Sequence, residues 1–169
     1  DYKRETMYQA LRKIADHQPR AVAYDFLGTT ATYGELLKAV DRCAGALSAQ
    51  GIGRGDRVTV ALPNTPHAVI VFYALNKLGA VAGMIHPLSA ASEIEFYLQL
   101  SNSTWAVTLD AFYAKFREVL DATTVKRLFL CRIGDFLSPV KRAGFWLTSG
   151  RKIPNAAGDP QVTYWRELM

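Results

Sequence analysis

Apolar and polar residues between positions 51 and 100 follow one another in blocks whose lengths suit a strand and a helix in turn. Residues 57–62 form a short β-branched run, with Gly55-Asp56 before it and Pro63-Asn64 after it. Turn residues on both sides of so short a run favour a strand over a helix. The chain is therefore expected to enter an α/β pattern at this point.

The helix and strand that follow complete a βαβ unit. Residues 66–78 are apolar around most of their helical circumference, with Thr65 at the capping position and Pro66 at the first helical position. Gly79 is expected to end this helix in the left-handed backbone conformation. Residues 80–85 show no polar alternation, so we expect a strand of a parallel sheet that is covered on both faces.

The same alternation extends to both sides of this unit. Thr32 and Glu35 have the spacing of a capping box in front of a helix that ends at Gly51. Ser89 and Asp110 are expected to cap two more helices. The remaining expected elements are a helix at residues 6–17, a hairpin at 21–26 and 30–33, helices at 90–100 and 111–120, and strands at 104–109 and 125–131.

Strands and helices in this order predict an α/β fold: an open, mostly parallel, doubly wound sheet with helices on both faces, plus a small N-terminal β-hairpin. The tail of the chain is expected to be surface loop with a short helix near residues 135–142, followed by an ordered segment at 162–169. We treat the whole chain as a single subdomain with three parts: a helix and hairpin at 1–33, a βαβ-type core at 34–131 and a loop-rich tail at 132–169.

Composition places the chain among ordinary globular proteins, with 50% apolar and 21% charged residues. No apolar run approaches the ~20 residues that span a bilayer, and the N-terminal stretch lacks the apolar core of a signal peptide. We therefore expect a cytoplasmic protein without a transmembrane segment. The net charge of +5 is scattered among acidic residues, so we expect no nucleic-acid partner.

Few residues of the sequence are candidates for metal binding, nucleotide binding or catalysis. Cys43 and Cys131 have no CxxC spacing and no neighbouring His, so we expect buried, reduced thiols and no metal site. Gly51, Gly53 and Gly55 end a helix and enter a strand, whereas a dinucleotide loop follows a strand and opens a helix. These glycines are therefore interpreted as turn residues. Without a GxSxG, Walker or HExxH pattern or paired carboxylates at useful spacing, we assign no catalytic and no metal-binding residue.

Three motifs stand in a fixed order along the first 130 residues. They are Thr32-Tyr33-Gly34-Glu35-Leu36, Gly51-Ile52-Gly53-Arg54-Gly55-Asp56-Arg57-Val58, and Asn76-Lys77-Leu78-Gly79-Ala80-Val81 with Pro87. Together they resemble the N-terminal portion of the AMP-forming adenylating enzymes, the superfamily that includes the acyl-CoA synthetases (AMP-dependent synthetases and ligases). Their order and spacing make the match more specific than any one motif.

The resemblance implies an acid–thiol ligase of fatty acid metabolism that works in two steps. ATP and a carboxylic acid give an acyl-adenylate and pyrophosphate, and CoA then displaces AMP to form a thioester. It also implies Mg²⁺, which offsets the charge that develops on the phosphates, and a mobile C-terminal lid domain that delivers a lysine.

The sequence departs from this family in lacking its phosphate loop, adenine-binding segment, ribose-binding Asp and catalytic Lys. Leu147-Thr148-Ser149-Gly150 imitates the start of the phosphate loop, but Arg151-Lys152-Ile153-Pro154 follows in place of the residues that would complete it. We therefore interpret the chain as an N-terminal fragment that is inactive alone and binds ATP, Mg²⁺ and CoA only as part of its parent. The alternatives are an adenylation domain of nonribosomal peptide synthesis and a non-catalytic α/β interaction module.

His86 is the one candidate for a substrate pocket. It follows the strand expected at residues 80–85, and open α/β sheets bind ligands at the carboxyl ends of their strands. The alternative is a helix-cap neighbour whose ring is already hydrogen-bonded. Arg142, Arg151 and Lys152 are candidates for contacts with the CoA phosphates in the parent enzyme, and the alternative for them is a solvated basic loop.

The resemblance also implies partners. In the parent ligase this part would pack against the remainder of its own N-terminal domain and meet the C-terminal lid domain, while the carboxylic acid and CoA bind to the assembled enzyme. An excised piece would expose the apolar surface of such a contact, so we expect self-association through that surface.

Overall fold

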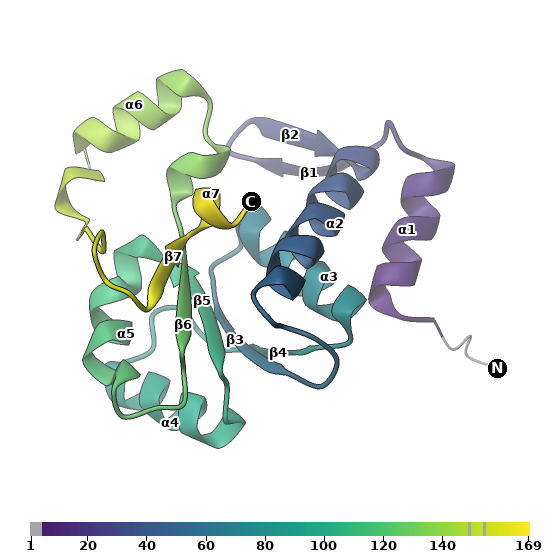
Figure 1. Cartoon of the computed structure of the whole chain (residues 1–169). Coiled ribbons are helices and arrows are strands. Elements are labelled where there is room, and N and C mark those ends of the chain that lie inside the picture. Colours follow the sequence, from purple (N-terminus) through teal and green to yellow (C-terminus); the bar gives the residue numbers. More distant parts are fainter. Residues whose placement is uncertain (1–4, 149, 154) are drawn as a thin grey trace.

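The computed structural model describes residues 5–148, 150–153 and 155–169. Its centre is a five-stranded sheet with the order β4-β3-β5-β6-β7, in which every pair of neighbours is parallel (Figure 1). The open parallel sheet expected from the sequence is therefore confirmed. The strands are β3 (Arg57–Ala61), β4 (Val81–Met84), β5 (Trp105–Leu109), β6 (Arg127–Cys131) and β7 (Val162–Tyr164).

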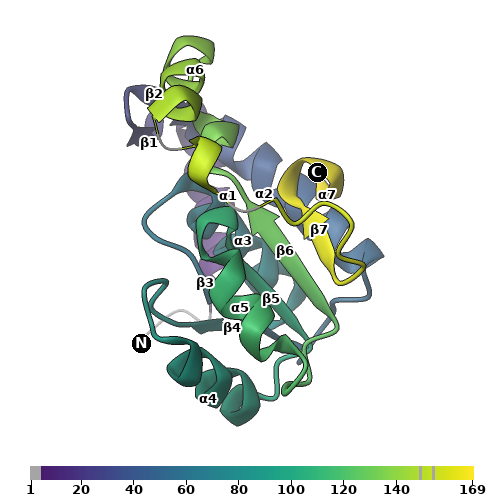
Figure 2. The ribbon, with the colours of Figure 1, turned by 90° about the vertical axis from the view of Figure 1, so that its left-hand side faces the viewer.

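Helices cover both faces of this sheet, as Figures 1 and 2 show from two directions. On one face lie α2 (Tyr33–Ala49) and α3 (Pro66–Leu78), with α1 (Met7–His17) packed against both of them. On the other face lie α4 (Ala91–Ser101) and α5 (Tyr113–Leu120), which pack against each other. The doubly wound arrangement is confirmed.

Each face has its own hydrophobic core, and strand β6 shows how one strand serves both. Phe129 and Cys131 belong to the core under α2 and α3, whereas Leu128 and Leu130 belong to the core under α4 and α5. Successive side chains of a strand point to opposite faces, so a strand buried on both sides is apolar at most of its positions. This requirement explains the unbroken apolar runs in the sequence.

The N-terminal hairpin consists of β1 (Val22–Phe26) and β2 (Thr29–Thr32), which pair antiparallel, as expected. Its two turn residues, Leu27 and Gly28, both have positive φ, at 53° and 76°. Two residues with φ > 0 make the tight turn whose twist matches that of the flanking strands. The hairpin leads directly into α2.

Helix α2 begins with the capping box that the sequence predicts. The Thr32 amide donates to Glu35 Oε2 at 2.8 Å, and the Glu35 amide donates to Thr32 Oγ1 at 3.3 Å. The hydrogen bond from the Thr32 backbone lowers the pKa of the Glu35 carboxyl. Thr65 occupies the capping position of α3, but its hydroxyl donates to the Pro63 carbonyl instead of accepting a helix amide.

Three expectations for the segment after α3 were wrong. Asp110 does not cap a helix, because it is the first residue of the 3₁₀ helix η1 (Asp110–Phe112) and Phe112 occupies the capping position of α5. Strand β4 lies at the edge of the sheet with a single partner, β3, so Val81 and Met84 are 51% and 52% exposed and the strand is not covered on both faces. Helix α4 is capped at Ala90, not at Ser89, because the Glu93 carboxylate reaches back and accepts the Ala90 amide at 3.0 Å. An apolar run predicts a strand, but it does not predict the position of that strand in the sheet.

The C-terminal tail is more ordered than the sequence indicated. After the 3₁₀ helix η2 (Ile133–Phe136) comes a ten-residue helix, α6 (Pro139–Thr148), where mostly surface loop was expected. A further 3₁₀ turn, η3 (Gly150–Lys152), precedes β7 and the short helix α7 (Trp165–Leu168). The ordered segment expected at 162–169 is confirmed, and through β7 it joins the central sheet.

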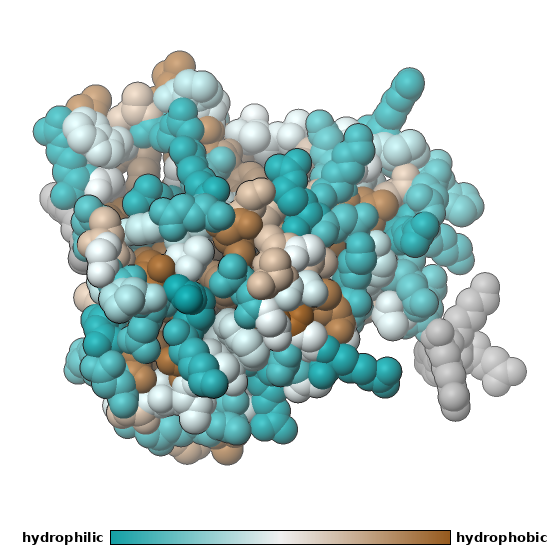
Figure 3. Space-filling view, viewed as in Figure 1, coloured by the Kyte–Doolittle hydropathy of each residue, from teal (hydrophilic) through white to brown (hydrophobic). Residues whose placement is uncertain are grey.

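The surface is mainly hydrophilic, with apolar patches between the charged groups on the face that Figure 3 shows. Among the described residues, no helix combines the length and apolar character needed to cross a membrane.

Candidate functional site

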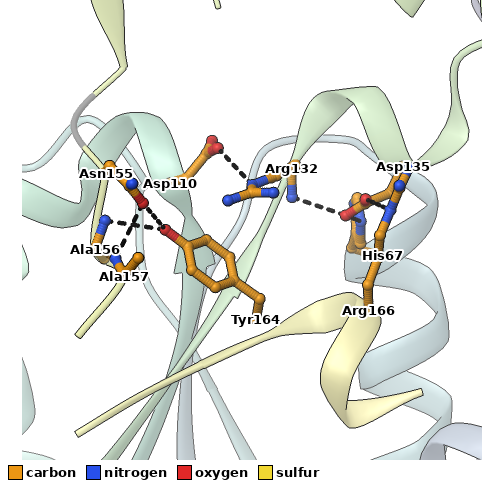
Figure 4. Close-up of polar contacts among 9 residues, drawn as sticks. All are labelled: His67, Asp110, Arg132, Asp135, Asn155, Ala156, Ala157, Tyr164 and Arg166. Carbon is orange, nitrogen blue, oxygen red and sulfur yellow. Dashed lines mark hydrogen bonds and ion pairs between the residues drawn. The ribbon is translucent and has the colours of Figure 1, made fainter. Parts of the chain in front are cut away.

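The carboxyl ends of the parallel strands meet at one edge of the sheet, where open α/β proteins bind their ligands. Polar side chains gather there just after three strands: Asp110 follows β5, Arg132 and Asp135 follow β6, and Arg166 follows β7 (Figure 4). His67, in the first turn of α3, joins them from the neighbouring helix. These residues form two clusters of ion pairs and hydrogen bonds.

The first cluster is centred on Asp135. Its Oδ2 atom lies 3.2 Å from His67 Nε2 and accepts the Arg132 amide at 2.9 Å, while its Oδ1 atom accepts Arg166 Nε at 2.7 Å. Burial acts to raise the pKa of the Asp135 carboxyl, but the hydrogen bonds from His67, Arg132 and Arg166 outweigh it and the pKa is lowered. Asp135 is therefore a buried, ionised acceptor that joins α3, η2 and α7.

The His67 ring is held by aromatic edges as well as by Asp135. The Phe136 and Trp165 rings meet it edge-on, with centroids 4.6 Å and 5.0 Å away. The His67 side chain is only 1% exposed, and its Nδ1 atom has no hydrogen-bond partner among the residues that the structure describes. The ring position is thus fixed by packing and by one hydrogen bond.

The second cluster is centred on Arg132. Its Nε atom lies 3.5 Å from Asp110 Oδ2, and its guanidinium carbon lies 4.0 Å from the centroid of the Tyr164 ring. Burial raises the pKa of the Asp110 carboxyl, and the charge of Arg132 opposes that shift without cancelling it. The Tyr164 hydroxyl accepts the Ala156 amide at 3.0 Å and lies 3.3 Å from Asn155 Oδ1. This cluster joins β5, β6 and β7 to the loop before β7.

A cavity of about 390 Å³ lies beside both clusters, and α6 forms one of its walls. Arg132, Arg142 and Arg166 line it together with Asp110 and Asp135. Phe145 and Trp146 of α6 add aromatic surface. The cavity therefore combines positive groups, apolar rings and an open position at the carboxyl edge of the sheet, the features that small-molecule sites share.

The structure keeps His86, the sequence candidate for a substrate pocket, apart from this cavity. His86 lies exposed in the loop after the edge strand β4, and its Nδ1 atom accepts the Leu88 amide at 3.2 Å. Of the basic candidates, Arg142 lines the cavity and Arg151 stacks on Trp146, with 4.4 Å between its guanidinium carbon and the ring centroid. The Lys152 side chain lies outside the described residues.

The segment that imitates a phosphate loop begins inside a helix. Thr148 is the last residue of α6, and its hydroxyl donates to the carbonyls of Gly144 and Phe145 in the preceding turn. Ser149 and Pro154 of this segment lie outside the described residues. Among those that are described, no three His, Cys, Asp or Glu side chains converge as metal ligands. The described residues at the start of this segment therefore belong to α6 and the turn η3.

Sequence reasoning missed His67, Arg132, Asp135 and Arg166. Arg132 and Asp135 come directly after the expected strand at residues 125–131, so their place at the carboxyl edge was a usable signal. His67 sits in an apolar helix and has no signal of its own, because its partner Asp135 lies 68 residues away.

Comparison with known proteins connects this fold to one family model. The model, described as AMP-binding enzyme, matches residues 11–151. A long-chain-fatty-acid–CoA ligase of Bacillus subtilis is 28% identical over 149 residues, which cover 88% of this chain and 27% of that protein. A long-chain-fatty-acid–CoA ligase of Haemophilus influenzae is 30% identical over 170 residues, which cover 99% of this chain and 30% of that protein.

Solved structures share the fold at lower identity. Coronafacic acid ligase from Pectobacterium brasiliense superposes with a TM-score of 0.77 over 96% of this chain and 29% of that chain, at 20% identity. Like the curated relatives, it is much longer than the chain, which spans between a quarter and a third of their lengths.

Proposed function

The chain belongs to the AMP-binding enzyme family, and from this premise we propose that it forms the N-terminal part of a longer acyl-CoA synthetase. In the proposed reaction a carboxylate attacks the α-phosphate of ATP, which gives an acyl-adenylate and releases pyrophosphate. The thiol of CoA then attacks the acyl carbon, and AMP leaves as the thioester forms. The substrate of the longer protein is thus a carboxylic acid in fatty acid metabolism.

The observation that carries this proposal is the family match, which runs through most of the chain from residue 11 to residue 151. The two relatives that cover 88% and 99% of the chain are named long-chain-fatty-acid–CoA ligases, which favours CoA over a carrier protein as the acceptor. The geometry is compatible, because the parallel sheet supplies a rigid edge on which a ligand site can be built.

The role proposed for this chain is that of a scaffold. We propose that residues 1–169 act as one subdomain, with parts at 1–33, 34–131 and 132–169, and that it packs against the rest of its N-terminal domain and the C-terminal lid. ATP, Mg²⁺ and CoA would bind to the assembled enzyme, because the phosphate loop and the adenine-binding segment that the family uses have no counterpart in this chain. The chain alone is then expected to be inactive, and the whole protein to act in the cytoplasm.

The test uses the full-length gene product that contains this chain. Acid-dependent exchange of labelled pyrophosphate into ATP is measured with acetate, 4-coumarate, palmitate and a set of amino acids, and CoA thioester formation is then measured by mass spectrometry. Exchange and thioester formation with a non-amino acid support the proposal. Exchange that requires an amino acid would assign the protein to nonribosomal peptide synthesis instead.

A matched experiment tests the scaffold role. Residues 1–169 alone should release no pyrophosphate with any acid that the full-length protein activates. Turnover by this piece would show that it carries its own catalytic groups. If the full-length protein also fails with every acid, the α/β interaction module becomes the better description.

A further inference from the structure

Helix α6 exposes large apolar side chains that take no part in the two hydrophobic cores. Val140, Trp146 and Leu147 are 82%, 55% and 59% exposed, and the helix has no buried residue. One exposed apolar side chain is ordinary, but a group of them on a single element indicates a surface that meets an apolar partner.

The apolar residues share one face of this helix. Val140, Ala143, Gly144 and Leu147 are three, four and seven positions apart, which places them on one side of α6, and all four are exposed. Phe145 lies on another side and lines the cavity at the edge of the sheet. Figures 1 and 2 show α6 at the rim of the molecule, away from the central sheet. The helix is therefore amphipathic, with an apolar face turned to the outside.

The N-terminal hairpin extends this surface. The Lys141 ammonium donates to the Leu27 carbonyl, so the turn between β1 and β2 lies beside α6 (Figures 1 and 2). The Leu27 side chain is itself exposed. The exposed side chains of Leu27, Val140, Trp146 and Leu147 together form what we term the α6 surface.

The helix and the turn after it carry only positive charge. Residues 136–158 contain no Asp or Glu, but they contain Lys141, Arg142, Arg151 and Lys152. The Arg151 guanidinium carbon lies 4.4 Å from the centroid of the Trp146 ring, so a cation lies directly against the aromatic part of the α6 surface. Apolar and aromatic side chains beside Lys and Arg complement the surface of an anionic bilayer, which offers acyl chains and negative headgroups together.

The same charge argues against a second copy of the chain as the partner. Two α6 surfaces in contact would bring together twice four basic residues without an acidic residue from the same segments, and like charges repel. The length of α6 also restricts how it can meet a bilayer. A helix of ten residues is too short to span the hydrocarbon core, so it can only lie along the surface.

We propose that the α6 surface binds an anionic lipid bilayer, with α6 lying in the plane of the headgroups. Val140 and Leu147 enter the boundary between headgroups and acyl chains, and Trp146 lies at headgroup level. Lys141 and Arg151 contact the lipid phosphates. The proposal does not depend on ligase activity, and it is compatible with a protein that acts in the cytoplasm, because an interfacial helix does not cross the bilayer.

The test is sedimentation of the 169-residue chain with lipid vesicles. Vesicles of phosphatidylcholine alone are compared with vesicles of phosphatidylcholine and phosphatidylglycerol in a 2:1 ratio. The wild-type chain should sediment with the anionic vesicles and much less with the neutral ones, and added salt should reduce the bound fraction. Tryptophan emission should shift to shorter wavelength on binding, because Trp146 is the most exposed of the three tryptophans.

Two pairs of variants separate the α6 surface from the rest of the molecule. Val140→Lys with Leu147→Lys should weaken partitioning into anionic vesicles about tenfold or more, because two apolar anchors are lost. Phe96→Lys with Leu100→Lys makes the same kind of change on α4 and should not weaken it.

Lys141→Gln with Arg151→Gln should weaken partitioning about fivefold or more, since two cations near the headgroups are removed. Arg12→Gln with Lys13→Gln removes two charges from α1, on the opposite side of the molecule, and should have a smaller effect (Figure 1). Circular dichroism of each variant establishes that lost binding does not reflect lost folding.

Equal sedimentation with neutral and anionic vesicles, or none with either, would overturn the proposal. It is also overturned if the variants on α6 and α4 partition equally, because binding would then follow overall composition and not the α6 surface. The longer protein that contains this chain is tested in the same way. If it does not bind anionic vesicles, the α6 surface is covered by the rest of that protein and not by lipid.

Discussion

The His67 Nε2 atom lies 3.2 Å from Asp135 Oδ2, although 68 positions separate the two residues in the sequence. Both side chains are almost fully buried, at 1% and 5% exposure. Arg166 binds the second oxygen of the same carboxylate, so one buried group joins the first turn of α3 to η2 and to α7.

Breaking the His67–Asp135 contact should destabilise the chain by about 2–3 kcal/mol, because a hydrogen bond to a charged and buried group is lost. In urea denaturation, His67→Ala and Asp135→Asn should each show this loss. The double variant should lose less than the sum of the two, with a coupling of about 1–3 kcal/mol. Asp121→Asn, which removes the 75% exposed partner of Arg117, is the control and should cost less than about 1 kcal/mol.

The two carboxylates of the site should give opposite dependences on pH. Asp135 has a lowered pKa in the folded chain, so its contribution to the unfolding free energy is present above about pH 3.8 and is lost as pH falls through the folded pKa. Asp110 has a raised pKa, so the folded chain loses stability as pH rises from about 3.8 through its folded pKa. Denaturation of Asp135→Asn and Asp110→Asn between pH 2.5 and 7 should each remove one of these slopes. Equal slopes in both variants and wild type would contradict the assignment.

Replacing Gly79 and Gly45 by alanine should change the unfolding free energy in opposite directions. Gly79 ends α3 at φ 72°, and an added Cβ would meet Arg54 Cγ at 3.3 Å, so Gly79→Ala should lower the unfolding free energy by about 1 kcal/mol. Gly45 lies inside α2 with nothing within 4 Å of an added Cβ, so Gly45→Ala should raise it by about 0.5–1 kcal/mol. Thermal unfolding measures both, and a shift of the same sign in the two variants would be inconsistent with the backbone described.

Both thiols should be inert in the folded chain. Burial raises the pKa of Cys43 to about 12, and burial also raises the pKa of Cys131. Because the thiolate is the reactive form, a disulfide reagent at pH 8 should label neither residue within minutes, and both should react in denaturant. Ser48→Cys places a thiol on the exposed side of α2 and should react promptly, so it serves as the positive control. Rapid labelling of the wild type would place a cysteine at the surface.

Self-association is expected through the edge of the sheet and the outer side of α4. Large apolar side chains are exposed there in a continuous part of the chain: Val81 and Met84 on β4, Leu88 in the following loop, and Phe96, Tyr97 and Leu100 on α4. Light scattering should show a mass that rises with protein concentration, because exposed apolar surface and an open strand edge favour pairing.

Variants locate the surface that associates. Phe96→Lys with Leu100→Lys should reduce the mass, whereas Val140→Lys on the exposed side of α6 should not. A chain that stays monomeric at millimolar concentration would rule this surface out as a contact.

The order and type of the elements could be predicted from the sequence because their signals are local. The capping box at Thr32 and Glu35 uses residues three apart, and the left-handed stop at Gly79 needs one residue without a Cβ. The apolar run of β6 follows from its burial on both faces. Each of these signals lies within one turn of helix or one strand.

What the sequence could not reveal depends on distant partners. The exposure of Val81 and Met84 follows from the position of β4 at the edge, and strand order is a property of the whole sheet. Helix α6 buries no residue and contains Pro139 and Gly144, so its part of the Gly-, Pro- and Lys/Arg-rich tail is typical of surface loop. The site also depends on distant partners. His67 meets Asp135 and Trp165 only when the loop after β6 and α7 fold onto α3.

The strand order β4-β3-β5-β6-β7 also fixes the timing of pairing during synthesis. β4 pairs with β3, β5 pairs with β3, β6 pairs with β5 and β7 pairs with β6. Each strand after β3 therefore finds its partner already made when it leaves the ribosome, and none waits for a segment still to be translated. A nascent chain stalled after any of these strands can hold a sheet that is complete up to that point, which limits the time during which unpaired edges are open to other chains.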